Sequence, residues 1–322
     1  MALGLIRPVV SRLGQSALVL LAMSFVVYGL MGLMPGDPID LMIAGDPRLT
    51  AADALRLKAL YGLDRPWIER WLGWLTQALQ GEFGYSRLYA LPVAAAMLPA
   101  IANTALLMVS ALTLSLAIAI PLGLWAARKP GSAADILVNL LAFASVSVPV
   151  FWLGLMLIVL FSVSLGWLPA GGLNTIGGPD SLGDRLAHLA LPVSTLALAG
   201  LGQFARHMRA AMIVESGRDY IRTARAKGCS PVRVLLRHQL RNALLPVVTI
   251  VALEIGGLFS GALVTETVFA WPGMGRLIYA SVMGNDFNLA LSGLLLATAM
   301  TLVGSVLADL AYWQLDPRVR GR

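Results

Sequence analysis

The chain of 322 residues is 58% hydrophobic and only 13% charged, and its mean hydropathy is +0.77. A charged fraction about half that of a soluble domain leaves too little polar surface to cover a water-soluble globule, and so apolar a composition also argues against a disordered chain. The net charge of +7 comes almost entirely from arginine, and in such a chain it indicates basic membrane loops rather than a nucleic-acid partner.

Six stretches are apolar over the roughly 20 residues that a membrane-spanning helix needs. We predict spans at Leu13–Met34, Ala100–Ala127, Ile136–Leu165, Leu186–Ala205, Leu244–Thr267 and Leu289–Leu310. The third is long enough to tilt or to include an interfacial turn. The first follows two arginines, as a secretory signal would, but its apolar run exceeds the roughly 7–15 residues of a signal and lacks a cleavage site, so we expect a retained anchor. The predicted fold class is an all-α integral membrane protein with six transmembrane helices.

Basic residues are unevenly distributed between the two sides of this bundle. Counting Lys and Arg by loop gives sixteen on the side that holds both termini and eight on the other. Because basic residues concentrate in cytoplasmic loops, we expect both termini inside and Pro35–Pro99 outside. The sequence therefore predicts three parts: an N-terminal segment with the first span (1–34), an external loop (35–99) and a core with five spans (100–322).

The external loop predicts two short helices. Thr50-Ala-Ala-Asp53 resembles a capping box and would start a helix that stops near Gly62, and a second helix follows Pro66. One face of the second helix carries Trp67, Trp71, Trp74, Leu75 and Ala78. We expect this stripe to pack on the transmembrane bundle or to lie at the membrane interface, and direct contact with a substrate is the alternative.

The basic segment between the fourth and fifth spans, residues 206–241, predicts a helix–turn–helix. Asp219–Lys227 suits a short helix that ends at Gly228, and Pro231 lies in the first turn of a second helix with Ser230 as its N-cap. Positive-inside pressure on a solvated loop would explain the charge but not these helix signals, so we favour an element that docks on a partner protein. Its apolar positions are Tyr220, Ile221, Ala224, Val234 and Leu235.

This segment and several others resemble one known family. Arg222-Thr-Ala224, three residues, Gly228, nine residues and His238-Gln-Leu-Arg241 have the spacing of the EAA loop of ABC importer permeases, with Arg, His and Arg in place of Glu, Ile and Pro. Matches to the dipeptide/oligopeptide/nickel branch cover nearly the whole chain in order. They are Pro35-Gly-Asp-Pro38, Leu60-Tyr-Gly-Leu-Asp-Arg-Pro66, Gly81-Glu-Phe-Gly-Tyr-Ser86, Glu266-Thr-Val-Phe-Ala-Trp-Pro-Gly-Met-Gly275 and Leu315-Asp-Pro-Arg318.

The resemblance implies a type I ABC importer permease fold in a bacterial inner membrane. Such a subunit forms part of the translocation pathway for peptides, nickel, metal chelates or a related small solute that an external substrate-binding protein delivers. Its other partners would be a second homologous permease subunit and two cytoplasmic ATP-binding subunits, which would hold ATP and Mg, so that this chain needs no cofactor. The EAA loop would enter a groove of an ATP-binding subunit as a coupling helix. The residues are Tyr220, Ile221, Arg222, Thr223, Ala224, Arg225, Ala226, Lys227 and Gly228.

The fifth span carries a carboxylate near the middle of the bilayer. Glu254 lies ten residues after Leu244, roughly 15 Å deep, where an unpaired charge costs at least ~2.5 kcal/mol. The same helical face carries Gly257, Leu258, Gly261 and Thr265. Because its glycines let another helix approach closely, we predict that this face lines the pathway or the interface with the second permease. A neutral, hydrogen-bonded Glu254 inside this chain's own bundle is the alternative.

The sequence holds no catalytic motif of its own. It has no phosphate-binding Gly-x-x-x-x-Gly-Lys-Ser/Thr, no Gly-x-Ser-x-Gly and no His-Glu-x-x-His, and its one cysteine and three histidines lack metal-ligand spacing. We therefore expect a chain that is not an enzyme and binds no metal. A secondary transporter or channel would show internal repeats, broken helices or several intramembrane charges, and a membrane-bound enzyme would show a catalytic cluster.

Overall fold

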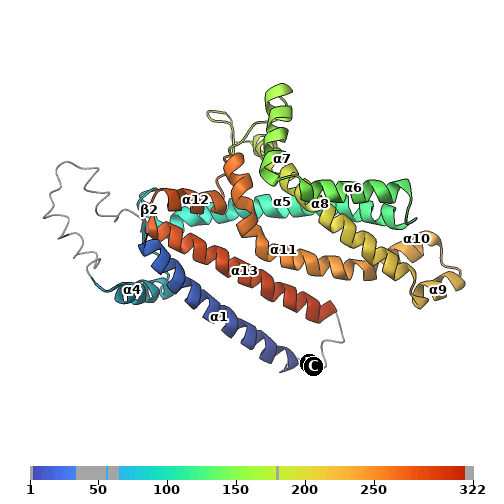
Figure 1. Ribbon diagram of the computed structural model, residues 1–322, viewed down its shortest axis with the longest axis horizontal. Helices are drawn as coiled ribbons and strands as arrows, with labels where there is room; N and C mark the ends of the chain where they lie inside the picture. Colours follow the sequence, from blue (N-terminus) through green and yellow to red (C-terminus); the bar gives the residue numbers. More distant parts are fainter. Residues whose placement is uncertain (1–2, 34–55, 57–64, 179–180, 316–322) are drawn as a thin grey trace. The chain divides into compact units, whose positions relative to one another are not determined.

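The computed structural model describes residues 3–33, 56, 65–178 and 181–315, and it describes only the backbone of 3–9, 253–261, 308 and 311–315. Nearly all regular structure in this part is helical (Figure 1). The chain divides into two compact units. The first comprises Met1–Ala102 and Gly273–Leu302, and the second comprises Asn103–Pro272 and Val303–Arg322.

Within the described residues, four helices are long and apolar enough to cross a membrane, or five if a bent pair counts as one span. The four are α1 (Leu3–Gly32), α5 (Val93–Ala127), α8 (Leu182–Ser216) and α13 (Phe287–Leu315). Together with the bent pair they coincide with five of the six predicted spans. The remaining one, Leu244–Thr267, falls within α11 (Leu240–Val268), where nine side chains in the middle lie outside the described residues.

The bent pair replaces the third predicted span. α6 (Ala133–Ser147) is followed after a bend of 101° by α7 (Val150–Leu157), which continues as a π-helix, η1 (Ile158–Ser164). Pro149 causes the break, because the residue before a proline avoids helical geometry and Val148 is accordingly extended (φ −85°, ψ 121°). Of the two arrangements that the length of this stretch allowed, a tilt or an included turn, the structure has a turn, and α7 points away from α6 (Figure 1).

In the first unit, α4 (Trp67–Leu79) packs on α1. The ring of Phe25 lies 4.8 Å from that of Trp67 and 5.3 Å from that of Trp71, and Trp71 Nε1 donates a hydrogen bond to Ser24 Oγ at 3.2 Å. The predicted packing of the tryptophan stripe on a transmembrane helix is therefore confirmed. The other helix predicted in this region falls on residues 50–62, of which the structure describes only Arg56.

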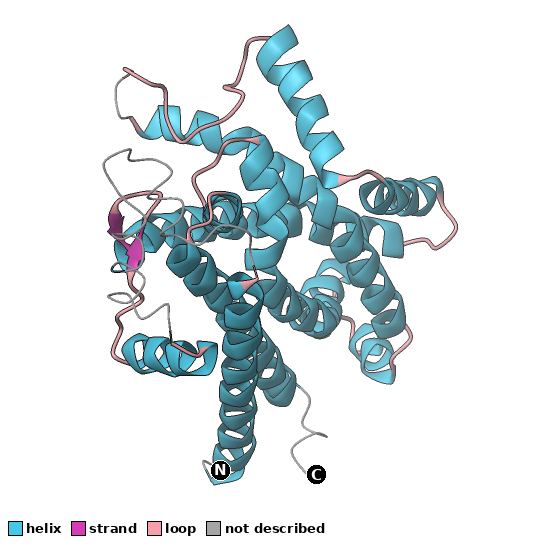
Figure 2. Ribbon diagram, turned by 60° about the vertical axis from the view of Figure 1, so that its left-hand side comes forward, coloured by secondary structure: helices cyan, strands magenta, loops and turns pink. Residues whose placement is uncertain are grey.

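The same unit contains a short antiparallel hairpin that the all-α prediction lacks. Its strands are β1 (Tyr85–Ser86) and β2 (Leu91–Pro92) (Figure 2). The buried carboxylate of Asp286, between α12 (Met274–Met283) and α13, accepts hydrogen bonds from Ser86 Oγ at 2.6 Å and from Leu88 N at 2.9 Å. The hairpin is thereby fixed to the start of α13.

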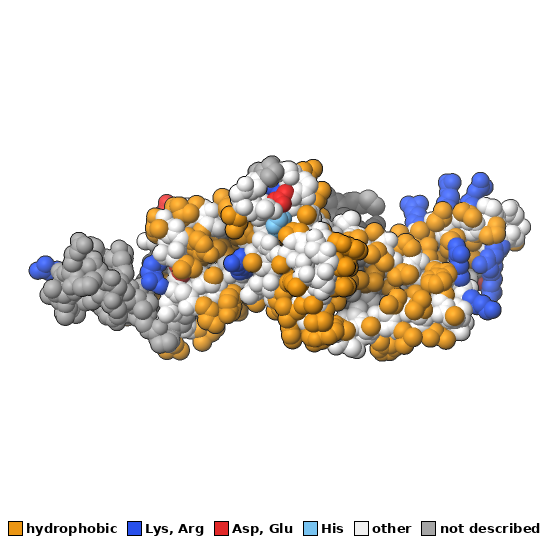
Figure 3. All heavy atoms as spheres, turned by 90° about the horizontal axis from the view of Figure 1, so that it is seen from above, with side chains coloured by type: hydrophobic (Ala, Val, Ile, Leu, Met, Phe, Trp, Pro, Cys, Tyr) orange, Lys and Arg blue, Asp and Glu red, His pale blue; other side chains and the backbone are white. Residues whose placement is uncertain are grey.

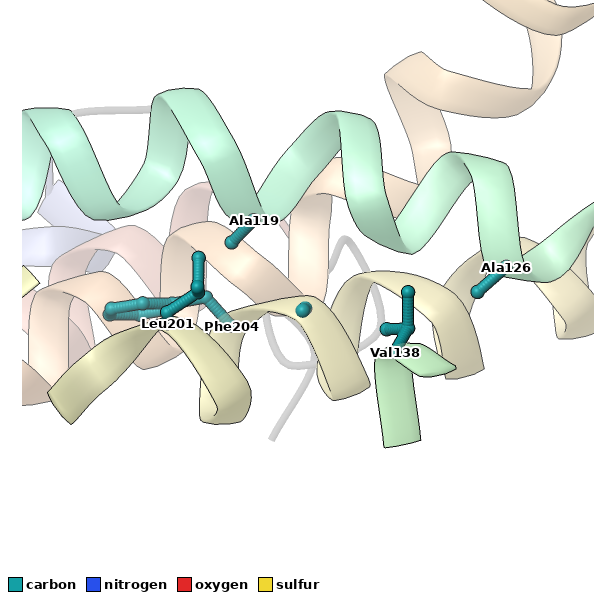
Figure 4. Packing of buried hydrophobic residues seen from close by; sticks show 6 residues of the cluster. Ala119, Ala126, Val138, Leu201 and Phe204 are labelled. Atoms are coloured by element: carbon teal, nitrogen blue, oxygen red, sulfur yellow. The ribbon is translucent and has the colours of Figure 1, made fainter. Parts of the chain in front are cut away.

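The second unit is built around α8, which packs against α5, α6 and α11. Small residues allow this close approach: a Cβ on Gly123 of α5 would lie 2.6 Å from Cβ of Met208 and 2.8 Å from the carbonyl oxygen of Ala205. Figure 4 shows one of its clusters, which is formed by Ala119, Ala126, Val138, Leu201, Phe204 and Ala205. The long helix α8 thus connects the apolar core with the basic segment that follows it.

Candidate functional site

The basic segment folds as the predicted helix–turn–helix. α9 (Asp219–Ala226) is followed by α10 (Pro231–Arg233), where Ser230 Oγ accepts a hydrogen bond from Arg233 N at 3.4 Å. Pro231 occupies the first turn, as expected from its fixed φ. The predicted loop 206–241 begins too early, however, because α8 continues to Ser216 and residues 206–216 are its last turns.

Gly228 allows the chain to reverse direction after α9. It has a left-handed conformation (φ +76°), in which Gly228 N donates to the carbonyl of Arg225 at 3.0 Å and Cys229 N donates to that of Ala224 at 3.2 Å. These two bonds are those of a Schellman motif, which satisfies the last carbonyl groups of a helix. Among the described residues, no atom lies within 4 Å of a Cβ built on Gly228, so the backbone conformation alone requires glycine here.

The apolar side chains of the two helices pack on each other. Ile221 and Ala224 of α9 are buried against Val234 at the start of the π-helix η2 (Val234–Gln239), with Cys229 beside them. Because these three predicted apolar positions form the loop's own core, they stabilise the loop and do not face outward. The loop is thus a small body with internal packing rather than a solvated connection.

The outward face of α9 is polar and basic. The side chain of Arg222 is 76% exposed, and its ion pair with Asp219 at 3.5 Å lies in solvent, where such pairs contribute little to stability. Figure 3 shows Lys and Arg side chains gathered at the end of the second unit that carries α9 and α10. The exposed members of the predicted set are Tyr220, Arg222, Thr223, Arg225, Ala226, Lys227 and Gly228. A partner protein would meet guanidinium groups here, not an apolar stripe.

Two side chains of the loop, those of Tyr220 and Gln239, make hydrogen bonds to the end of α8. The Tyr220 hydroxyl donates a hydrogen bond to Glu215, and partial burial together with this bond raises the pKa of Tyr220. The buried amide of Gln239 donates from Nε2 to the carbonyl of Met212 at 2.9 Å and to Ser216 Oγ at 2.5 Å. Sequence reasoning did not single out Gln239, and its spacing from α8 gives no local signal.

The start of α11 packs on the same part of α8. Met208 and Met212 form a buried cluster with Ala243 and Val247 of α11 and with Ala127 at the end of α5. Because the loop is covalently continuous with both α8 and α11, a displacement of α9 would reach both helices. A cavity of about 480 Å³ lies beneath the loop, and its walls include Arg128, Ser216, Arg225, Cys229 and Leu235.

A charged pair joins α8 to α6 close to this end of the unit. The guanidinium group of Arg209 binds the carboxylate of Asp135 in a bidentate manner, with Nη2 2.7 Å from Oδ2 and Nε bonded to Oδ1. Asp135 also accepts from Gly131 N at 2.8 Å and from Asn139 Nδ2 at 2.9 Å. The carboxylate is buried, whereas the arginine side chain is 23% exposed. Sequence analysis counted Arg209 only as a loop charge and missed this pair.

The predicted pathway face of α11 is only partly described. The side chains of Glu254, Gly257, Leu258 and Gly261 lie outside the described residues, and Thr265 is buried. Next to Thr265, the buried carboxyl of Glu266 accepts a hydrogen bond from Thr104 Oγ1 of α5 at 2.5 Å. This end of α11 is therefore packed on α5, while the role predicted for the face remains a prediction.

Comparison with known proteins reveals one consistent family. Residues 119–321 match the model described as "Binding-protein-dependent transport system inner membrane component". The chain is 38% identical to the oligopeptide transport system permease protein AppB of Bacillus subtilis, over 97% of this chain and 98% of that protein. It is 34% identical to the dipeptide transport system permease protein DppB of Escherichia coli K12 (97% and 98% covered) and 34% identical to the di/tripeptide transport system permease protein DppB of Pseudomonas aeruginosa (96% and 97%). The chain therefore belongs to the binding-protein-dependent inner-membrane transport family, and it is a multi-pass membrane permease of the peptide branch of ABC importers.

Proposed function

We propose that this chain is one of two permease subunits of an ATP-driven importer and that its substrates are short peptides. The observation that carries the proposal is the similarity over nearly the full length to proteins named for oligopeptide, dipeptide and di/tripeptide transport. Nickel and metal chelates were within the range of the resemblance, but none of these three relatives is named for them. ATP hydrolysis would take place on two cytoplasmic ATP-binding subunits, and an external binding protein would deliver the peptide.

Transport by the reconstituted complex tests this function. The chain is assembled in liposomes with its second permease and two ATP-binding subunits, with ATP on the side of the latter and the binding protein on the other. We expect uptake of labelled di- and tripeptides that requires both ATP and the binding protein. Uptake of a nickel chelate without uptake of peptides would overturn the proposal that the substrates are peptides. Peptide uptake in the absence of the ATP-binding subunits would indicate a secondary transporter.

The proposal includes six spans, three sequence parts (1–34, 35–99 and 100–322) and cytoplasmic termini. Cysteine labelling with an impermeant maleimide tests the orientation on a Cys229→Ser background. Glu82→Cys and Ser230→Cys suit the test because both positions are exposed, whereas Ser86 in the same external loop is buried. In intact spheroplasts Glu82→Cys should react, and Ser230→Cys should react only after lysis. The reverse pattern would contradict the orientation.

The proposed role of α9 is to receive movement from an ATP-binding subunit. Three features support it: an exposed basic face, an internal core that keeps the loop rigid, and polar contacts to α8. Because a rigid element fixed between two long helices moves with both of them, closure of the partner below would tilt α8 and α11. The membrane pathway would then open to one side and close to the other.

The proposed pathway face of α11 predicts an effect of Glu254 on transport. Glu254→Gln keeps the volume and removes only the possible charge, so assembly should survive while uptake of some peptides changes. Glu254→Leu should cost more, since it also removes hydrogen bonding in a segment where polar groups are expensive. Uptake is normalised to the amount of assembled complex. A lower yield with unchanged normalised uptake in both variants would place Glu254 inside this chain's own bundle.

A further inference from the structure

α4 carries two apolar stripes, of which only one is covered by the described residues. The tryptophan stripe packs on Phe25 and Tyr28 of α1. The adjacent stripe has helical spacing and consists of Ile68, Leu72 and Leu79, residues that are 50%, 47% and 81% exposed. Glu69 and Gln77 lie on the opposite side of the helix, so α4 is amphipathic with an unusually wide apolar face.

The contact with α1 fixes the depth of α4. Ser24, which binds Trp71, lies eight residues before Gly32 at the end of α1, which is about 12 Å along a helix axis at ~1.5 Å per residue. The apolar sequence of α1 continues to Met34, and its next charged residue is Asp37. With the predicted span Leu13–Met34 across the hydrocarbon core, half of which measures ~15 Å, Trp71 contacts α1 at the depth of acyl chains.

The direction of α4 and the surface next to it agree with this depth. α4 lies across α1 rather than along it (Figure 2), as a helix in the plane of the membrane would lie across a spanning helix. α1 itself presents exposed apolar residues close to this depth, including Met23 and Val26. The exposed stripe of α4 and this part of α1 thus both present apolar residues that the described part of the chain leaves uncovered.

We propose that α4 is an interfacial helix immersed in the leaflet at the C-terminal end of α1, with Ile68, Leu72 and Leu79 in contact with lipid acyl chains. The tryptophans bind it to α1, and the polar side of the helix faces the headgroups and water. Amphipathic helices with a polar face opposite a face of Trp, Phe and Leu bind membranes in this way. The proposal rests on membership of the membrane family and on the packing of α4, and is independent of the substrate.

Spin-label accessibility tests the proposal on the full chain in phosphatidylcholine/phosphatidylglycerol nanodiscs with Cys229→Ser. Nitroxides are attached at Leu72→Cys and Leu79→Cys, and at Gln77→Cys on the opposite side as the matched control. Oxygen concentrates in the hydrocarbon, whereas a nickel chelate remains in water. At positions 72 and 79 we expect the nitroxide to collide more often with oxygen than with the nickel chelate. At position 77 we expect the nickel chelate to collide with it more often than oxygen does.

Two other outcomes would overturn the proposal. A nickel chelate that reaches positions 72 and 79 as readily as 77 would place the stripe in water. Low collision rates with both reagents at positions 72 and 79 would show that protein covers the stripe, either another segment of this chain or a second subunit. Two positions are used because agreement between them excludes a local disturbance by one substitution, and an unchanged gel-filtration profile confirms that each variant is folded.

Discussion

Replacing Gly228 with valine is expected to separate ATP hydrolysis from transport. Gly228 has φ +76°, a conformation that costs an ordinary residue about 1–2 kcal/mol and a β-branched residue more. Valine would therefore unwind the Schellman turn and release the core that Ile221, Ala224 and Val234 form. With α9 no longer held rigidly, closure of an ATP-binding subunit would not reach α8 and α11. The assembled complex should keep its basal ATPase activity but lose both the stimulation of that activity by substrate and peptide uptake.

The space around Gly228 supplies a graded control. No described atom would touch an added Cβ, so the effect should follow backbone preference and not side-chain size. Asparagine tolerates the left-handed region better than alanine, and we expect activity to decrease in the order Gly, Asn, Ala, Val. Peptide uptake and ATPase activity of purified complexes measure this order. Normal coupling in Gly228→Val would refute the proposed role, and equal loss in Asn and Val would indicate a steric contact with the partner instead.

Removal of the Arg209 side chain is expected to lower the free energy of unfolding by about 2–3 kcal/mol. This is less than the ~3–5 kcal/mol lost when one partner of a fully buried pair is removed, because the Arg209 side chain is 23% exposed. Arg209→Ala leaves the buried carboxylate of Asp135 without its bidentate partner, and the junction between α6 and α8 loosens. The thermal midpoint of the detergent-solubilised chain should fall by several degrees. The thermal midpoint of Arg209→Lys should lie between those of the unchanged chain and Arg209→Ala, because an ammonium group keeps the charge but cannot make the planar bidentate contact.

A double-mutant cycle decides whether the two groups act as a pair. The double variant Asp135→Asn/Arg209→Gln removes both charges at once. Its loss of unfolding free energy should be smaller than the sum of the losses in the two single variants, because each single change leaves one unpaired charge and the double change leaves none. Strictly additive effects would show that Arg209 stabilises the fold through its apolar stem alone. Asn139→Ala serves as a control, because it removes a neutral hydrogen bond to the same carboxylate.

Local signals predicted the parts of this structure that neighbouring residues determine. Continuous apolar runs located five of the candidate membrane spans, and Gly228, Ser230 and Pro231 located the turn after α9 within one residue. The length of the third stretch allowed an included turn, but a bend of 101° at one place depends on what surrounds it. The hairpin held by Asp286 depends on groups 200 residues apart in sequence.

The missed parts of the site are long-range polar contacts. Asp135 and Arg209 are separated by 74 residues, and Gln239 and Met212 by 27, so no spacing rule brings them together. The apolar positions of α9 were identified correctly, but they face the inside of the loop and not a partner protein. A helical period shows which residues share a face but not which element packs against that face. Only the position of Val234 decides that Ile221 and Ala224 point inward.

The separation of buried and exposed positions on α9 has an evolutionary consequence. The residues that form the loop core, Ile221, Ala224 and Val234, are buried and are not those that a partner would touch, so the two sets are free to diverge at different rates. Arg222 illustrates this freedom: it stands where the general pattern of the family has glutamate, yet its exposed side chain leaves the loop core unchanged. After duplication of an importer within one genome, changes in a few surface charges would therefore be enough for each permease to bind only its own partner subunits, while the fold of the loop stays the same.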